Sequence, residues 1–89
     1  MKWYQKAADH GNAEAQTNLG FMHANGQGTP FNPSLAYCYW QIVRFNGRAE
    51  GKEGLEALKR IMTPAQITKA EELVKEMLKK NPKLLNKKD

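Results

Sequence analysis

Apolar residues recur at intervals of three and four along this chain, the spacing that gathers side chains on one side of an α-helix. The pattern is clearest between positions 64 and 80, where the apolar residues are Ile67, Ala70, Leu73, Val74, Met77 and Leu78. Charged residues such as Lys69, Glu72 and Lys75 fill the positions between them. The pattern predicts an amphipathic helix that covers a core with one face and meets water with the other.

Capping residues mark where the helices begin and end. Asn12 and Asn32 can each accept a hydrogen bond from the first turn of a following helix. Thr63 and Gln66 have the spacing of a capping box, and Gly11 stands where a helix C-terminus commonly requires glycine. These signals predict an all-helical chain without a sheet, with helices over residues 2–10, 13–25, 33–46, about 48–62 and 64–80.

Three glycines fall inside the predicted helices rather than at their ends: Gly20, Gly51 and Gly54. A glycine inside a helix costs up to about 1 kcal/mol relative to alanine. We therefore expect these glycines to weaken their helices unless another helix packs so closely that a larger residue would not fit.

The chain repeats itself once, with a spacing of 36 residues. Trp3-Tyr4-Gln5 returns as Tyr39-Trp40-Gln41, and Gly11, Ala13, Glu14 and Leu19 return as Gly47, Ala49, Glu50 and Leu55. A repeat of this length is typical of solenoids, in which one helical unit is stacked on the next. Solenoids generally bind other macromolecules along an extended surface, so the repeat indicates a binding function.

The repeating residues are similar to those of a known family. The stretch Trp3 to Gln16, followed by Leu19-Gly20, Gly26-Gln27-Gly28, Asn32, Ala36 and Tyr39, resembles the bacterial Sel-one-like repeat. The resemblance implies tetratricopeptide-like helix pairs stacked in a right-handed superhelix, and a role as a non-enzymatic scaffold or adaptor. It fades between 48 and 62, where Glu56 stands at the position of Gly20. Two positions depart from the family pattern: His23 replaces a tyrosine and Thr29 a valine.

These observations predict a single domain of all-α class: a helix-turn-helix repeat solenoid of about five helices with a C-terminal capping helix. The domain spans 1–80, with a partial repeat over 1–11, a repeat over 12–47 and a degenerate repeat with the cap over 48–80. Residues 81–89 are expected to form a flexible basic tail. The arrangement resembles the C-terminal end of a longer repeat protein.

The first predicted helix corresponds to the second helix of a pair, so the family pattern leaves its usual partner helix absent. Trp3, Tyr4, Ala7 and Ala8 would then form an exposed apolar face. We expect the isolated chain to self-associate through this face, because exposed apolar patches mark interfaces and matched faces close most simply as a homodimer. The alternative is that Trp3 folds onto the helix that follows.

In helix-pair solenoids of this kind, the first helices of successive pairs line the concave surface. Helical spacing places Glu14, Asn18, Phe21 and Asn25 on the side of the second predicted helix opposite its apolar stripe. Their equivalents one period later are Glu50, Gly54, Ala57 and Ile61. We predict a groove for an extended peptide or a partner helix, with Phe21 as its anchor and Asn18 and Asn25 binding backbone. The alternative is that Phe21 is an ordinary, partly buried surface residue.

The net charge of +5 is concentrated at the C-terminal end, in Lys75, Lys79, Lys80, Lys83, Lys87 and Lys88. Such a basic end can bind nucleic acid or an anionic membrane surface, which is the alternative function. No aromatic residue interleaves these lysines, so they offer no platform for base stacking. A solvated helix end is the simpler explanation of these lysines, and protein binding is therefore the preferred function.

No pattern of residues indicates catalysis, a cofactor or a metal. His10 and His23 lack the spacing of a helical metal pair, and the single cysteine, Cys38, lies among aromatics as a small buried residue would. No run of the 89 residues is long and apolar enough to predict a transmembrane helix, and the first residues given lack the apolar region of a signal peptide. It is expected to be cytoplasmic as given, or periplasmic or secreted if it is a fragment of a longer chain.

Overall fold

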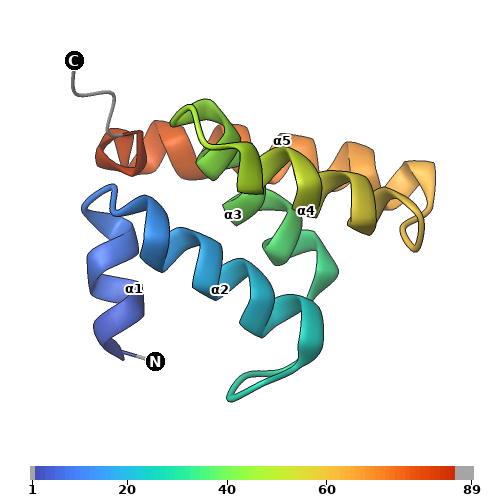
Figure 1. The fold of residues 1–89 in the computed structure, drawn as a ribbon. Helices are drawn as coiled ribbons and strands as arrows, with labels where there is room; N and C mark the ends of the chain where they lie inside the picture. The colour runs from blue at the N-terminus through green and yellow to red at the C-terminus, as the bar shows by residue number, and fades with distance from the viewer. Residues whose placement is uncertain (1, 86–89) are drawn as a thin grey trace.

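Five α-helices and one short 3-10 helix make up residues 2–85, the part of the chain that this computed structural model describes (Figure 1). They are α1 (Lys2–Asp9), α2 (Ala13–Asn25), α3 (Pro33–Phe45), α4 (Ala49–Lys59), α5 (Pro64–Lys80) and η1 (Pro82–Leu84). No strand occurs within residues 2–85, so the predicted all-α class is confirmed.

The predicted caps are present at the helix N-termini. The Asn12 side chain accepts a hydrogen bond from the Ala15 amide at 2.8 Å, and Asn32 accepts one from the Leu35 amide at 3.1 Å. Thr63 begins α5 with both hydrogen bonds of a capping box. These contacts satisfy backbone donors that the first turn of a helix leaves unpaired.

The chain leaves α1 and α3 through equivalent turns. Gly11 has φ of 91° and Gly47, one period later, has φ of 86°. Both values lie in the left-handed region, where glycine avoids the steric cost that a Cβ would bring. The 36-residue repeat is therefore a repeat of backbone geometry as well as of sequence.

Helix α4 ends earlier than the sequence pattern predicts. It stops at Lys59, and residues 60–62 form a turn, although Met62 remains buried. The reason lies in the next helix: Thr63 must be extended to cap α5, and the proline after it disfavours helical backbone at Thr63. The apolar spacing that continues to Met62 reflects burial in the turn.

Helix α3 is the centre of the domain and contacts α2, α4 and α5 (Figure 1). Seven of its residues are buried: Ala36, Tyr37, Cys38, Tyr39, Trp40, Ile42 and Val43. One group of core residues joins α3 to α4 and α5, and a second joins Tyr39 to α1 and α2. A helix buried on nearly all sides thus holds both halves of the stack together.

Two of the three interior glycines surround the side chain of Trp40. A Cβ at Gly20 of α2 or at Gly54 of α4 would overlap with the indole, which therefore lies between these two helices. The Trp40 Nε1 donates to the Thr17 carbonyl of α2 at 3.3 Å. At Gly51 a Cβ would overlap with the backbone of α3 itself. Close packing of a neighbouring helix therefore explains all three glycines, which is the exception expected from the sequence.

The segment after α5 corrects the prediction of a flexible tail from residue 81. Leu84 is buried, and its carbonyl accepts hydrogen bonds from Gln16 at 2.9 Å and from Asn46 at 3.1 Å. Asn81 donates to the Asp9 carbonyl at 3.0 Å. Residues 81–85 are therefore packed across the ends of α1, α2 and α3. The remainder of the predicted tail, 86–89, lies outside the described residues.

The packing of Trp40 predicts the effect of enlarging Gly20. The Gly20→Leu substitution should lower the free energy of unfolding by on the order of 1–3 kcal/mol, because the new side chain overlaps with the indole. Chemical denaturation followed by circular dichroism measures this. The control is Glu53→Leu at an exposed helical position, which should change stability by less than about 0.5 kcal/mol. Equal stability of Gly20→Leu and the parent chain would contradict the described packing.

Candidate functional site

The residues predicted to line the binding surface lie on the solvent side of α2 and α4. Glu14 and Asn25 are exposed, Asn18 is half-buried, and Phe21 is 52% exposed. Their counterparts Glu50, Ala57 and Ile61 are exposed, whereas Gly54 is half-buried beneath Trp40. The two rows lie on helices that contact each other. We call the surface formed by Glu14, Asn18, Phe21, Asn25, Glu50, Ala57 and Ile61 the α2–α4 face.

Phe21 is the most prominent apolar side chain that α2 contributes to this face. Its ring meets the indole of Trp40 edge to face, with ring centroids 5.3 Å apart and an angle of 78° between the planes. Trp40 is only 4% exposed and is held by Gly20, Gly54 and the Thr17 carbonyl. A closely packed aromatic group therefore supports an exposed one, which lowers the entropy that Phe21 would lose on binding.

The contact of Trp40 with Phe21 is not predicted by the sequence pattern. The repeat identifies Trp40 only as the counterpart of Tyr4 and gives no link to Phe21. The available signal was the pair of interior glycines, Gly20 and Gly54, which indicate that something large approaches both helices. That the large group is Trp40 depends on the relative placement of three helices.

The predicted N-terminal apolar face is smaller than expected. Ala8 is fully buried against Ala15, Leu19 and Tyr39, so it cannot contribute to an exposed face. Tyr4 and Ala7 are half-buried at the edge of the same core. The reason is that α1 uses its Ala8 side to pack on α2, which leaves fewer apolar groups exposed.

Trp3 is the exposed part of this N-terminal face. It is 70% exposed and contacts Tyr4 edge to face, with centroids 5.2 Å apart. It also borders a shallow depression with Gln5, Lys6 and Asp9. Tyr39, its equivalent one period later, is 4% exposed. With so much of its surface in water, Trp3 gains little from packing onto α2.

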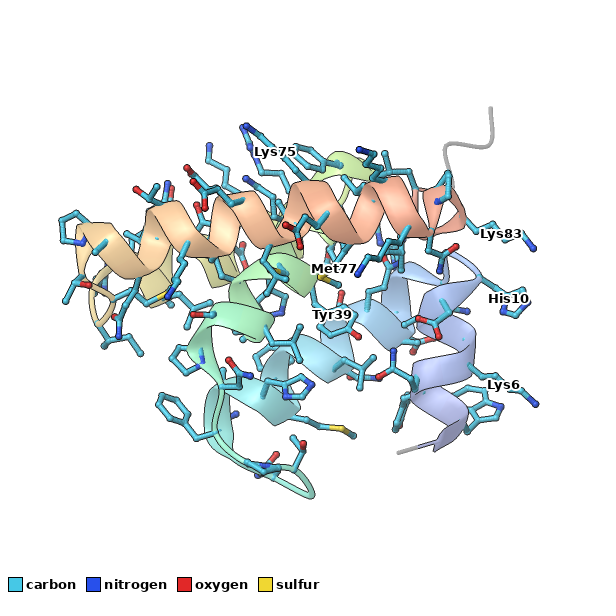
Figure 2. The ribbon with its side chains drawn as sticks, turned by 180° about the vertical axis from the view of Figure 1, so that it is seen from behind. Lys6, His10, Tyr39, Lys75, Met77 and Lys83 are labelled. Atoms are coloured by element: carbon cyan, nitrogen blue, oxygen red, sulfur yellow. The ribbon has the colours of Figure 1, made fainter. Side chains whose placement is uncertain are left out.

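A polar chain runs from α1 into the core around Tyr39. The Gln5 side-chain amide donates to the Tyr39 hydroxyl at 2.9 Å and to the Asp9 carboxylate at 3.1 Å. Figure 2 shows Tyr39 beneath Met77 of α5, while Lys6 and His10 extend away from the core. Burial raises the pKa of Tyr39. The hydrogen bonds of Gln5 give the buried Tyr39 hydroxyl a partner and hold α1 in position.

The profile of the Sel1 repeat family matches residues 1–12 and 13–42. The first match covers α1 and the turn after it, and the second covers α2 and most of α3. The first 42 of the chain's 89 residues therefore match the Sel1 repeat. The resemblance found in the sequence is thereby confirmed, together with the helical repeat fold that it implies.

A curated relative shares part of this repeat region. The ERAD-associated E3 ubiquitin-protein ligase component HRD3A of Arabidopsis thaliana is 49% identical over 37 residues. The match covers 42% of this chain and 6% of the plant protein, so it concerns the repeat and not the whole relative. No solved structure matches the chain significantly.

The lysines near the C-terminal end do not form an uninterrupted basic surface on α5. Lys75, Lys79 and Lys80 are exposed, and so are three glutamates of the same helix, Glu71, Glu72 and Glu76. Figure 2 shows Lys75 and Lys83 extending from the outer side of α5 and η1. Lys87 and Lys88 lie outside the described residues.

Chemically reactive groups are either buried or scattered. Cys38 is buried and donates to the Ala70 carbonyl at 3.3 Å, and burial raises its pKa to about 12, so the thiol stays protonated. Within residues 2–85 no three His, Cys, Asp or Glu side chains come together as a metal site would require. In the same part of the chain, no helix is long and apolar enough to cross a membrane.

His23 is buried without full compensation. It is 7% exposed, its ring is stacked on Tyr39 with centroids 5.9 Å apart, and its Nδ1 has no hydrogen-bond partner among the described residues. Loss of hydration lowers the pKa of His23 below 6.5, and the backbone of Pro30 acts in the opposite direction.

This burial predicts a dependence of stability on pH. Because the pKa of His23 is lower in the folded state than in the unfolded state, the unfolded state binds more protons as pH falls through 6.5. The free energy of unfolding should therefore be smaller at about pH 5.5 than at about pH 7.5, two values on either side of the ordinary pKa of histidine.

Denaturation of two variants at both pH values shows whether His23 causes the difference in stability. His23→Phe should remove most of the difference, whereas His10→Gln, at an exposed position, should keep it. An unchanged difference in His23→Phe would show that another group is responsible.

Proposed function

We propose that this chain is a non-enzymatic scaffold or adaptor that binds a peptide or a helix of another protein on the α2–α4 face. Sel1 repeats generally mediate protein–protein interaction. The plant relative is described as a component of a ubiquitin ligase, which agrees with a role of the repeat in holding proteins together.

The observation that carries this proposal is the exposed Phe21 supported by the buried Trp40. Aromatic side chains that are held in place before binding are frequent among the residues that dominate interface energies. Ala57 of α4 and Ile61 in the turn after it are exposed apolar residues as well, and Asn18 and Asn25 can pair with the backbone of a bound segment. The face thus combines apolar anchors with polar groups, as interfaces do.

The alternative, binding of nucleic acid or an anionic membrane through the lysine-rich end, is supported less well. The glutamates interleaved on α5 reduce the positive potential there, and phosphate recognition depends on that potential. Binding through phosphate contacts would weaken by orders of magnitude between about 50 and 200 mM salt, which distinguishes the two functions.

Mutation of the α2–α4 face tests the proposed function. A partner recovered by pull-down from the native host and identified by mass spectrometry should bind Phe21→Ala about 30-fold more weakly, as expected for loss of a central aromatic anchor. Asn18→Ala should reduce affinity less. The matched control is Phe45→Ala, which removes a 37% exposed phenylalanine from the end of α3. Binding of Phe21→Ala and Asn18→Ala with parental affinity, at unchanged stability, would reject this face.

The N-terminal face supports a second interaction. We propose that Trp3, with the exposed parts of Tyr4 and Ala7, mediates self-association of the isolated chain as a homodimer. Pairing would remove much of the apolar surface of an exposed tryptophan from water, which favours association.

Sedimentation velocity at several concentrations tests this association. The sedimentation coefficient of the parent chain should rise with concentration, and that of Trp3→Ala should not. A chain that remains monomeric at all concentrations, with or without Trp3, would refute the dimer and leave the α2–α4 face unaffected.

A further inference from the structure

The apolar part of the α2–α4 face has a definite position along the two helices. Phe21 lies in the second half of α2, while Ala57 and Ile61 lie in the last turn of α4 and just beyond it. Phe21 is 52% exposed and Ile61 is 64% exposed. A segment bound across both helices would therefore place its apolar side chains near the C-terminal ends of α2 and α4.

The N-terminal half of the same face carries carboxylates. Glu14 and Glu50 occupy equivalent positions one period apart in the first turns of α2 and α4, and Glu53 follows on α4. All three are exposed, and none forms an ion pair with another of the described residues. The helix dipole favours acidic groups in a first turn, which accounts for Glu14 and Glu50. Its effect is weaker at Glu53, which lies beyond the first turn.

Basic side chains near these carboxylates lie mostly on other surfaces. Lys52 and Lys59 project from the opposite side of α4, where they line a depression with Glu56 and Glu71. Arg48 borders the turn next to Glu14, and Arg60 stands beside Ile61 at the apolar end. In a chain of net charge +5, the first turns of this face are therefore locally acidic.

This charge pattern excludes one kind of partner and favours another. An acidic peptide would place its carboxylates beside Glu14, Glu50 and Glu53, where Arg48 is the neighbouring cation, and the like-charge contacts oppose binding. A segment with lysines or arginines at one end would meet opposite charge there, while its apolar residues reach Phe21 and Ile61.

We propose that the partner bound by the α2–α4 face is an amphipathic segment in which apolar side chains are followed, at one end only, by lysine or arginine. The apolar residues contact Phe21, Ala57 and Ile61, and the basic end contacts Glu14, Glu50 and Glu53. This inference rests on the proposed function and adds the chemistry and the direction of the bound segment.

Selection from a random peptide library displayed on phage tests it with the full chain as the target. The expected peptides combine apolar residues with a basic cluster on one side, and they bind Phe21→Ala weakly. Peptides that depend on Phe21 but lack the basic cluster, or carry an acidic one, would overturn this inference and leave the proposed function standing. If no selected peptide depends on Phe21, the proposed function fails and the inference fails with it.

Charge-neutralising variants then measure the contribution of the carboxylates. For a selected peptide, the combined Glu14→Gln, Glu50→Gln and Glu53→Gln variant should lose on the order of tenfold in affinity at low salt, and the loss should shrink as salt is raised. The matched control, Glu56→Gln, Glu72→Gln and Glu76→Gln, makes the same change in net charge at exposed positions elsewhere. Equal losses in both variants would show that only overall charge matters and would overturn the inference.

Discussion

The contact of Trp40 with two glycines is the constraint on which the rest of the domain depends. The indole comes from α3 and fills the space between α2 and α4, and a methyl group at either Gly20 or Gly54 would overlap with it. The position of the indole determines the distance between α2 and α4, the first helices of successive pairs. Since glycine is unfavourable inside a helix, the cost of two glycines is accepted here in return for the burial of a large aromatic side chain. The same contact holds the ring on which Phe21 rests.

A buried amide, Gln16, provides the polar counterpart of this apolar contact. Its Nε2 donates to the carbonyls of Ala8 and Leu84, and its Oε1 accepts from Asn46. Three separate segments of the chain thus converge on one fully buried side chain. A buried polar group is costly unless all its hydrogen bonds are made, so this network favours one arrangement of α1, α3 and η1 over alternatives. It also explains why residues 81–85 are ordered.

The two exposed aromatic sites of the chain differ in how they are supported. Phe21 stands on a rigid part of the repeat, beside Trp40 and between two packed helices. Trp3 contacts mainly its neighbour Tyr4 at the outer edge of α1. Its counterpart Tyr39 is covered by His23 of α2 and receives a hydrogen bond from Gln5 of α1. The same position in the repeat is therefore a core position in one unit and a surface position in the other, depending on what packs against it.

The sequence alone determined the helices, their caps and the repeat, because these depend on residues within a few positions of one another. Asn12, Asn32 and the Thr63 capping box acted as their spacing predicts, and the 36-residue period identified the helix pairs. The sequence also placed Phe21 and its neighbours on one side of α2. Tertiary structure decided what lies behind them: that Trp40 supports Phe21, that Ala8 is buried, and that Leu84 returns to cover Gln16. Those outcomes depend on contacts between residues far apart in the chain, such as that of Gln16 with Leu84 across 68 positions, and local spacing carries no information about which of many apolar residues will meet.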